Sequence, residues 1–150
     1  MKKFVFFAML SAVWAAAPPN HSLGNLDDVV RDLKALINRT ASDLKTHAAR
    51  VKQEMGLTAT QEEREMLARF EASVESLESP VFQRLLNSHR RVNRASRPYL
   101  AVTIRQFAES THESLKEMGQ TDPNSGMQTL ATEWARITVR ARLCSSQLAR

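Results

Sequence analysis

Residues 127–148 read MQTLATEWARITVRARLCSSQL, and this stretch decides the fold. Its apolar and small side chains recur at alternating intervals of three and four residues. That spacing predicts one long helix with a continuous apolar seam. We expect the seam to pack against other helices of the same chain, the alternative being a coiled coil with a partner chain. The seam consists of Met127, Leu130, Trp134, Ile137, Ala141, Cys144 and Leu148.

Two further helices with apolar stripes are predicted in the first half of the chain. The first runs from near Asn25 to Gly56, because glycine commonly ends a helix. Thr60 and Glu63 form a capping-box pattern, which begins a second helix that ends near Ser79. The apolar positions of the two helices are Leu26, Val30, Leu33, Ile37, Leu44, Val51, Met55, Met66, Leu67, Phe70, Val74 and Leu77.

Prolines delimit the middle of the chain. Ser79-Pro80 predicts the start of a third helix, or a kinked continuation of the second, which ends at Arg97-Pro98. A fourth helix then runs to Gly119. With the segment 127–148, these elements predict an all-α fold, an up-and-down bundle of four to five helices that follows a cleaved signal peptide.

Residues 1–17 have the pattern of a secretory signal peptide, with two lysines, an apolar run and three alanines. Proline directly after a scissile bond is poorly tolerated, so Pro18 disfavours cleavage after Ala17. We therefore prefer cleavage after Ala15, which makes 1–15 the signal peptide and leaves Ala17 as the alternative end.

The predicted mature chain is a flexible segment, 16–24, followed by one helical domain, 25–150. Its predicted destination is the extracellular space, with the bacterial periplasm as the alternative. We expect no transmembrane segment in it, because no second apolar run approaches the length of a membrane span. Cleavage removes Lys2 and Lys3 and lowers the formal net charge from +5 to +3.

The single cysteine, Cys144, lies on the seam of the last helix. A lone cysteine has no partner for an internal disulfide, so packing alone must stabilise the fold. We expect a buried thiol and a monomer, the alternative being a dimer linked through Cys144.

Charge is arranged in blocks along the chain. Residues 54–80 hold seven glutamates against two arginines, whereas residues 81–108 hold arginines and no acid. On the predicted third helix the arginines lie opposite the apolar side chains. Such a face suits sulfate, phosphate or carboxylate groups, the alternative being a face that is solvated or paired within the bundle. The candidate binding residues are Arg84, Arg90, Arg91, Arg94 and Arg97.

The function that the sequence favours is a secreted, non-enzymatic protein that uses this arginine face to engage an acidic protein or a polyanion. Nucleic acid is an improbable partner for an exported chain. The alternative is a carrier of a lipid or another apolar small molecule inside the bundle. The residues that would line such a site are Met66, Phe70, Phe82, Phe107 and Met118.

Catalytic and metal-binding signatures do not emerge from the sequence. The four histidines are scattered and lack cysteines or paired acids at ligand spacing, so we predict no metal and no cofactor. His89 lies on the apolar side of its predicted helix and is interpreted as a core or boundary residue. No glycine-rich phosphate loop or nucleophile motif occurs, so we predict no enzyme activity and no catalytic residue.

Two short patterns have other readings. The sequons at Asn20 and Asn38 are candidate glycosylation sites. The tetrapeptide RDLK at 31–34 and the tripeptide EER at 62–64 resemble in part the Arg-x-Leu-Arg and Glu-Glu-Arg signals of oomycete effectors. The first departs from that pattern at Lys34, and both fall inside predicted helices, so no family is assigned from them.

Overall fold

The computed structural model describes residues 25–149, which form helices and connecting turns with no strand among them. The all-α prediction is confirmed for this part of the chain. The signal peptide, its cleavage site and Asn20 lie outside the described residues. The α-helices are α2 (Leu26–Met55), α3 (Gln61–Leu77), α4 (Pro80–Asn87), α5 (Arg97–Thr121) and α6 (Met127–Leu148), and the two 3₁₀ turns are η1 (Gly56–Thr58) and η2 (His89–Arg91).

Local capping sets the helix boundaries in the first half of the molecule. The Asn25 side chain accepts a hydrogen bond of 2.9 Å from the backbone N–H of Asp27, which starts α2. Gly56 ends α2 with a φ of 58°, a conformation that favours glycine. Thr60 and Glu63 form both hydrogen bonds of the capping box at the start of α3. The predicted boundaries at these positions are confirmed.

The predicted third helix, continuous to Arg97, is wrong. Helix α4 ends at Asn87, and the Ser88 hydroxyl donates to the carbonyl oxygen of Leu85. After η2 the backbone becomes extended at Val92. The side chain of Asn93 then accepts from the backbone N–H of Ser96 and forms a turn. Serine and asparagine side chains that bond to nearby backbone groups thus replace the last turns of the expected helix.

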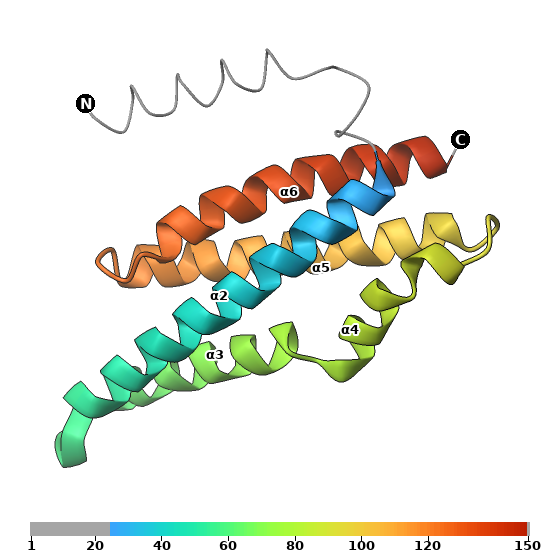
Figure 1. Ribbon diagram of the computed structural model, residues 1–150. Coiled ribbons are helices and arrows are strands. Elements are labelled where there is room, and N and C mark those ends of the chain that lie inside the picture. Colours follow the sequence, from blue (N-terminus) through green and yellow to red (C-terminus); the bar gives the residue numbers. More distant parts are fainter. Residues whose placement is uncertain (1–24, 150) are drawn as a thin grey trace, which may run out of the picture.

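The helices form two hairpins, α2 with α3 and α5 with α6, and the chain passes from the first to the second through α4 (Figure 1). Helices α5 and α6 lie side by side and run in opposite directions, and α2 crosses them with its N-terminal half (Figure 1). Helix α3 returns along the C-terminal half of α2. Helix α4 then turns away and leads to η2 and the start of α5. Among the described residues, no helix is both long and apolar enough to span a membrane.

The turn between α5 and α6 requires a close approach. Helix α5 continues two residues past the predicted end at Gly119, which is buried. A Cβ atom at Gly119 would lie 2.6 Å from the Cγ of Gln128, and the Gln128 amide donates to the Gly119 carbonyl oxygen. The glycine is therefore explained by its contact with α6 and not by a helix end.

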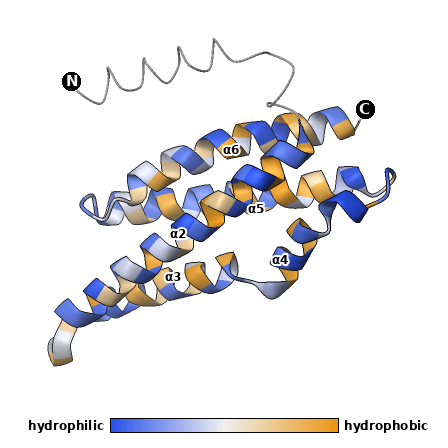
Figure 2. Cartoon of the chain, in the orientation of Figure 1, coloured by the Kyte–Doolittle hydropathy of each residue, from blue (hydrophilic) through white to orange (hydrophobic). Residues whose placement is uncertain are grey.

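The core is centred where α2, α5 and α6 meet, and Figure 2 shows hydrophobic residues on the facing sides of these helices. Trp134 is fully buried, and its indole N–H donates to the Thr40 hydroxyl at 2.8 Å. All positions of the predicted seam from Met127 to Cys144 are buried, and Leu148 is half-buried. Packing of the seam within the chain and burial of Cys144 are confirmed.

The α3–α4 pair contributes much less to this core. Phe70 and Leu77 are the buried residues of α3, and Leu86 is the one in α4. Phe82 on α4 stacks on Phe107 of α5, with 4.0 Å between the ring centroids. These contacts attach the pair to the rest of the molecule along one side and leave most of its surface exposed to solvent.

Candidate functional site

Four of the five predicted arginines are exposed around the end of α4. Arg84 lies on α4, Arg90 and Arg91 lie in η2, and Arg94 lies in the connection to α5. None of them forms an ion pair with any residue of the described part of the chain. We call these four residues the basic patch.

Arg97 does not belong to the basic patch. It is the first residue of α5, and its guanidinium lies 3.5 Å from the carboxylate of Asp27 at the start of α2. The side chain is 35% exposed, so it is partly withdrawn from solvent. The expectation of five arginines on one helical face is therefore wrong, because the chain leaves the helix at Ser88 and Arg97 turns inward.

His89 anchors the turn that presents the basic patch. Its ring Nδ1 donates to the carbonyl oxygen of Leu86 at 2.9 Å, and its Nε2 lies 3.0 Å from Asp27 Oδ1. The residue is 7% exposed, as expected for a core or boundary histidine. Because His89 points inward, the next two residues, Arg90 and Arg91, are exposed. The sequence carries no signal for this contact, since Asp27 lies in a distant helix.

A shallow groove on α4 brings apolar and basic groups together. Its volume is about 570 Å³, and Arg84 and Arg91 are both part of its lining. Val81 is 73% exposed and adds an apolar side chain to the lining. The remaining lining residues are Leu85, Asn87 and Ser88. The groove holds no acidic residue, so its charge is uncompensated.

Several other cations of the described region are paired with acids from neighbouring helices. Arg140 on α6 lies 2.7 Å from Asp32 on α2, and Arg142 lies 2.8 Å from Glu109 on α5. Arg39 on α2 pairs with Glu133 on α6. Pairing within the fold therefore accounts for these cations, whereas it does not account for those of the basic patch.

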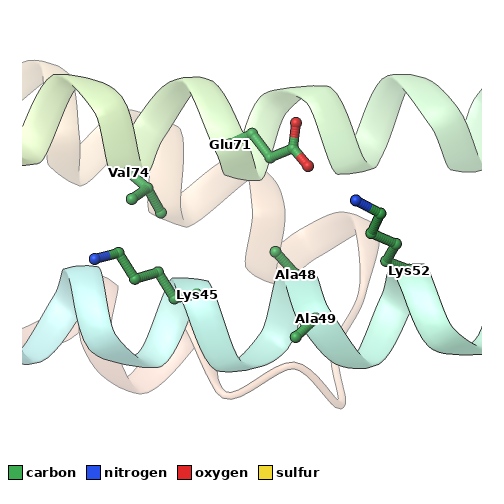
Figure 3. A pocket seen from close by; sticks show the side chains of 6 residues that line it. All are labelled: Lys45, Ala48, Ala49, Lys52, Glu71 and Val74. Atoms are coloured by element: carbon green, nitrogen blue, oxygen red, sulfur yellow. The ribbon is translucent and has the colours of Figure 1, made fainter.

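A second groove, between α2 and α3, has compensated charge (Figure 3). Lys45 and Lys52 extend from α2, while Glu71 and Val74 extend from α3 beside Ala48 (Figure 3). Lys45 pairs with the carboxylate of Glu78 at 2.7 Å. With about 280 Å³ and both signs of charge, this groove is a weaker candidate for an anion than the basic patch.

The residues of the apolar-ligand alternative do not come together in one site. Phe70 and Met118 are core residues, 0% and 6% exposed. Phe82 and Phe107 cover each other by stacking. Met66 lines a separate surface groove with polar residues of α3 and with Asp122. The five residues therefore do not line one common groove of the described region, and the apolar-ligand site stays a prediction.

The sequon at Asn38 includes a residue with a structural role. Asn38 is exposed on α2, but Thr40 is 0% exposed and accepts the hydrogen bond of Trp134. This hydrogen bond explains the threonine without a glycan, and Asn38 remains a prediction as a glycosylation site.

Metal ligands do not cluster in residues 25–149, where no group of three or more His, Cys, Asp or Glu side chains is placed to hold an ion. His47 is buried in α2 and lies 3.4 Å from the carboxylate of Asp122, with the ring of Phe70 at its edge.

Comparison with protein-family models, with curated proteins and with solved structures finds no match for this chain.

Proposed function

We propose that this chain is a secreted, non-enzymatic binding protein, an up-and-down helical bundle that engages an acidic protein or a polyanion through the basic patch. The observation that carries this proposal is that Arg84, Arg90, Arg91 and Arg94 are all exposed and form no ion pair with residues 25–149. By contrast, Arg39, Arg140 and Arg142 pair with acids of neighbouring helices.

The chemistry of arginine supports this choice of partner. A guanidinium offers a planar set of donors that matches carboxylate, sulfate and phosphate oxygens in pairs. Four such groups within eleven residues, with no acid between them, create a local positive potential. Because the groups are exposed, salt should screen their attraction for an anion strongly.

Retention on a sulfated-polymer column tests the proposal. We expect the protein to be retained at low salt and released as salt increases. A variant with all four patch arginines changed to alanine should elute at a clearly lower salt concentration. The matched control changes four other exposed cations, Arg50, Lys52, Arg64 and Lys116, to alanine and removes the same net charge.

The two variants distinguish a local site from net charge alone. If the patch variant and the control variant lose retention equally, overall charge explains the binding and the patch proposal is wrong. Retention of the patch variant at the salt concentration of the unmodified protein contradicts it as well.

A further inference from the structure

The carboxylate of Asp27 lies against both ends of the segment that carries most of the basic patch. Residues 90–96 include three of the four patch arginines. His89 precedes this segment, and its Nε2 lies 3.0 Å from Asp27 Oδ1. Arg97 follows the segment, and its guanidinium lies 3.5 Å from the same oxygen. The two ends of the segment therefore meet at a single atom.

Asp27 is itself fixed by the start of α2. Its backbone N–H donates to the Asn25 side chain at 2.9 Å, as part of the cap that begins the helix. A carboxylate in the first turn of a helix also interacts favourably with the helix dipole. Val29 and Val30, which follow in α2, are buried in the core. The carboxylate is thus a fixed negative charge at the edge of the core.

The contact between Asp27 and His89 depends on charge. Asp27 Oδ1 and His89 Nε2 are both buried, and neither atom forms a hydrogen bond with the described residues. The other ring nitrogen, Nδ1, donates to the carbonyl oxygen of Leu86. A neutral ring with its proton on Nδ1 would turn a lone pair toward the carboxylate, whereas the protonated ring is attracted to it. The protonated ring therefore suits this contact.

Three helices supply the charged and titratable groups around this contact. Asp27 comes from α2 and Arg97 from α5. On α6, burial raises the pKa of the Cys144 thiol, while Arg97 lowers it and Asp27 raises it. The thiol is thus within range of both charges, and the ends of α2, α5 and α6 converge beside His89.

We propose that Asp27 is a positioning residue for anion binding, which closes the segment 90–96 through protonated His89 and through Arg97. This inference rests on the proposed function, because it concerns how the same arginines are held. Donors that are already ordered lose less conformational entropy when a ligand binds. The closure therefore strengthens anion binding, although the residue that makes it is an acid.

The sign of the effect of Asp27→Asn separates positioning from net charge. Loss of an acid makes the protein more positive, so charge alone predicts release from the sulfated-polymer column at a higher salt concentration. Loss of the closure predicts release at a lower one. The matched control, Asp28→Asn, removes the same charge from the same turn, where Asp28 lies 3.3 Å from Arg31 of its own helix. We expect Asp27→Asn to elute before the unmodified protein and Asp28→Asn to elute with it or after it.

The pH dependence of retention tests the part of His89. The gap in eluting salt concentration between the two variants should widen as pH falls from about 7.5 to about 5.5, because only the protonated ring attracts the carboxylate. The remaining histidines are present in both variants and do not alter the gap. An equal gap at both pH values overturns closure through His89. Elution of Asp27→Asn with or after Asp28→Asn at about pH 5.5 overturns the whole proposal.

Amide hydrogen exchange tests the closure without any anion. The backbone N–H groups of Arg91 and Ser96 donate to carbonyl oxygens inside the connection, at 2.9 and 3.1 Å. Their exchange at about pH 5.5 should accelerate in Asp27→Asn and not in Asp28→Asn, while the amides of α6 stay protected in both. Unchanged exchange in both variants overturns the proposal. Equal acceleration in α6 overturns it as well, since Asp27 then stabilises the whole fold.

The two measurements separate this inference from the proposed function. If the unmodified protein is not retained on the column but the amides of the connection respond to Asp27→Asn, the closure is supported and the anion-binding function is wrong. If the patch arginines are needed for retention but the amides do not respond, the function is supported and the closure is wrong.

Discussion

The α5–α6 pair and the α3–α4 pair are both made of consecutive helices, but they differ in how much they bury. The first pair provides Trp134, Ile104 and most of the seam to the core, whereas α3 and α4 together bury three residues fully. The candidate binding surface lies on the second pair. In a region with few buried contacts, many side chains are not needed to stabilise the fold, and they stay exposed to solvent.

Residue composition explains the difference. Helix α6 repeats its apolar positions without interruption, so one continuous stripe faces α5 and α2. Helix α3 has five glutamates in 17 residues, and α4 has only eight residues. A short helix and a highly charged one offer little apolar surface, so the free energy gained by their burial is small.

The largest effect is expected at Trp134 in the α5–α6 pair. Trp134→Ala should lower the free energy of unfolding by about 3–5 kcal/mol, because it leaves a cavity beside Phe107. It also removes the indole N–H that donates a hydrogen bond to the Thr40 hydroxyl. Urea unfolding followed by circular dichroism measures this change. Val139→Ala, at an exposed position of the same helix, should change stability by less than about 0.5 kcal/mol. Equal losses in both variants contradict the central position of Trp134.

A smaller effect is expected at Phe82, which attaches α4 to α5. Phe82→Ala should cost about 1–3 kcal/mol, since the ring is only half-buried and its main contact is the stack on Phe107. Amide hydrogen exchange should accelerate in α4 while α5 and α6 stay protected. Val81→Ala serves as the exposed neighbouring control. If exchange accelerates equally in all three helices, α4 belongs to the same cooperative unit as the core.

The smallest effect concerns Cys144 and appears only at high pH. Burial raises the pKa of the Cys144 thiol above its ordinary value of 9.0, Arg97 lowers it and Asp27 raises it. The folded protein therefore keeps the thiol proton at a pH where the unfolded chain has lost it. The contribution of this thiol to the free energy of unfolding is fully present at pH values below the thiol pKa of the unfolded chain. It decreases as pH rises through about 9, by at most about 1.4 kcal/mol per pH unit.

Comparison of the unmodified protein with Cys144→Ala isolates this contribution. The difference in unfolding free energy between pH 7 and about 10 should be smaller in the variant, because the variant lacks the thiol and the rest of the chain is the same in both proteins. An identical pH dependence in the two proteins contradicts a raised thiol pKa. Slow alkylation of the native thiol, and rapid alkylation after unfolding, should accompany the expected result.

Much of the fold could be predicted from the sequence, since its signals are local. Asn25, Gly56 and the Thr60–Glu63 capping box act within a few residues, and the structure confirms each of them. The seam of α6 is a periodic signal and was likewise predictable. The continuous third helix was not, because the hydrogen bonds of Ser88 and Asn93 outweighed the helical pattern.

The candidate site was predictable only in part. The sequence indicated a run of arginines without acids, and four of the five are exposed together. It gave no indication that Arg97 turns toward Asp27, or that His89 anchors the turn between them. Those contacts join residues that are distant in the chain, so periodicity and capping patterns carry no information about them.

The sequence by itself determined most of the helical segments, the caps that start α2 and α3, and which side of α6 is buried. Those properties follow from spacing and from hydrogen bonds between near neighbours. Only the tertiary structure decided which charges are neutralised, because an ion pair depends on which helices become neighbours. Asp27 pairs with Arg97 and removes it from the arginine face, whereas Arg84, Arg90, Arg91 and Arg94 stay exposed and form no ion pair with the described residues.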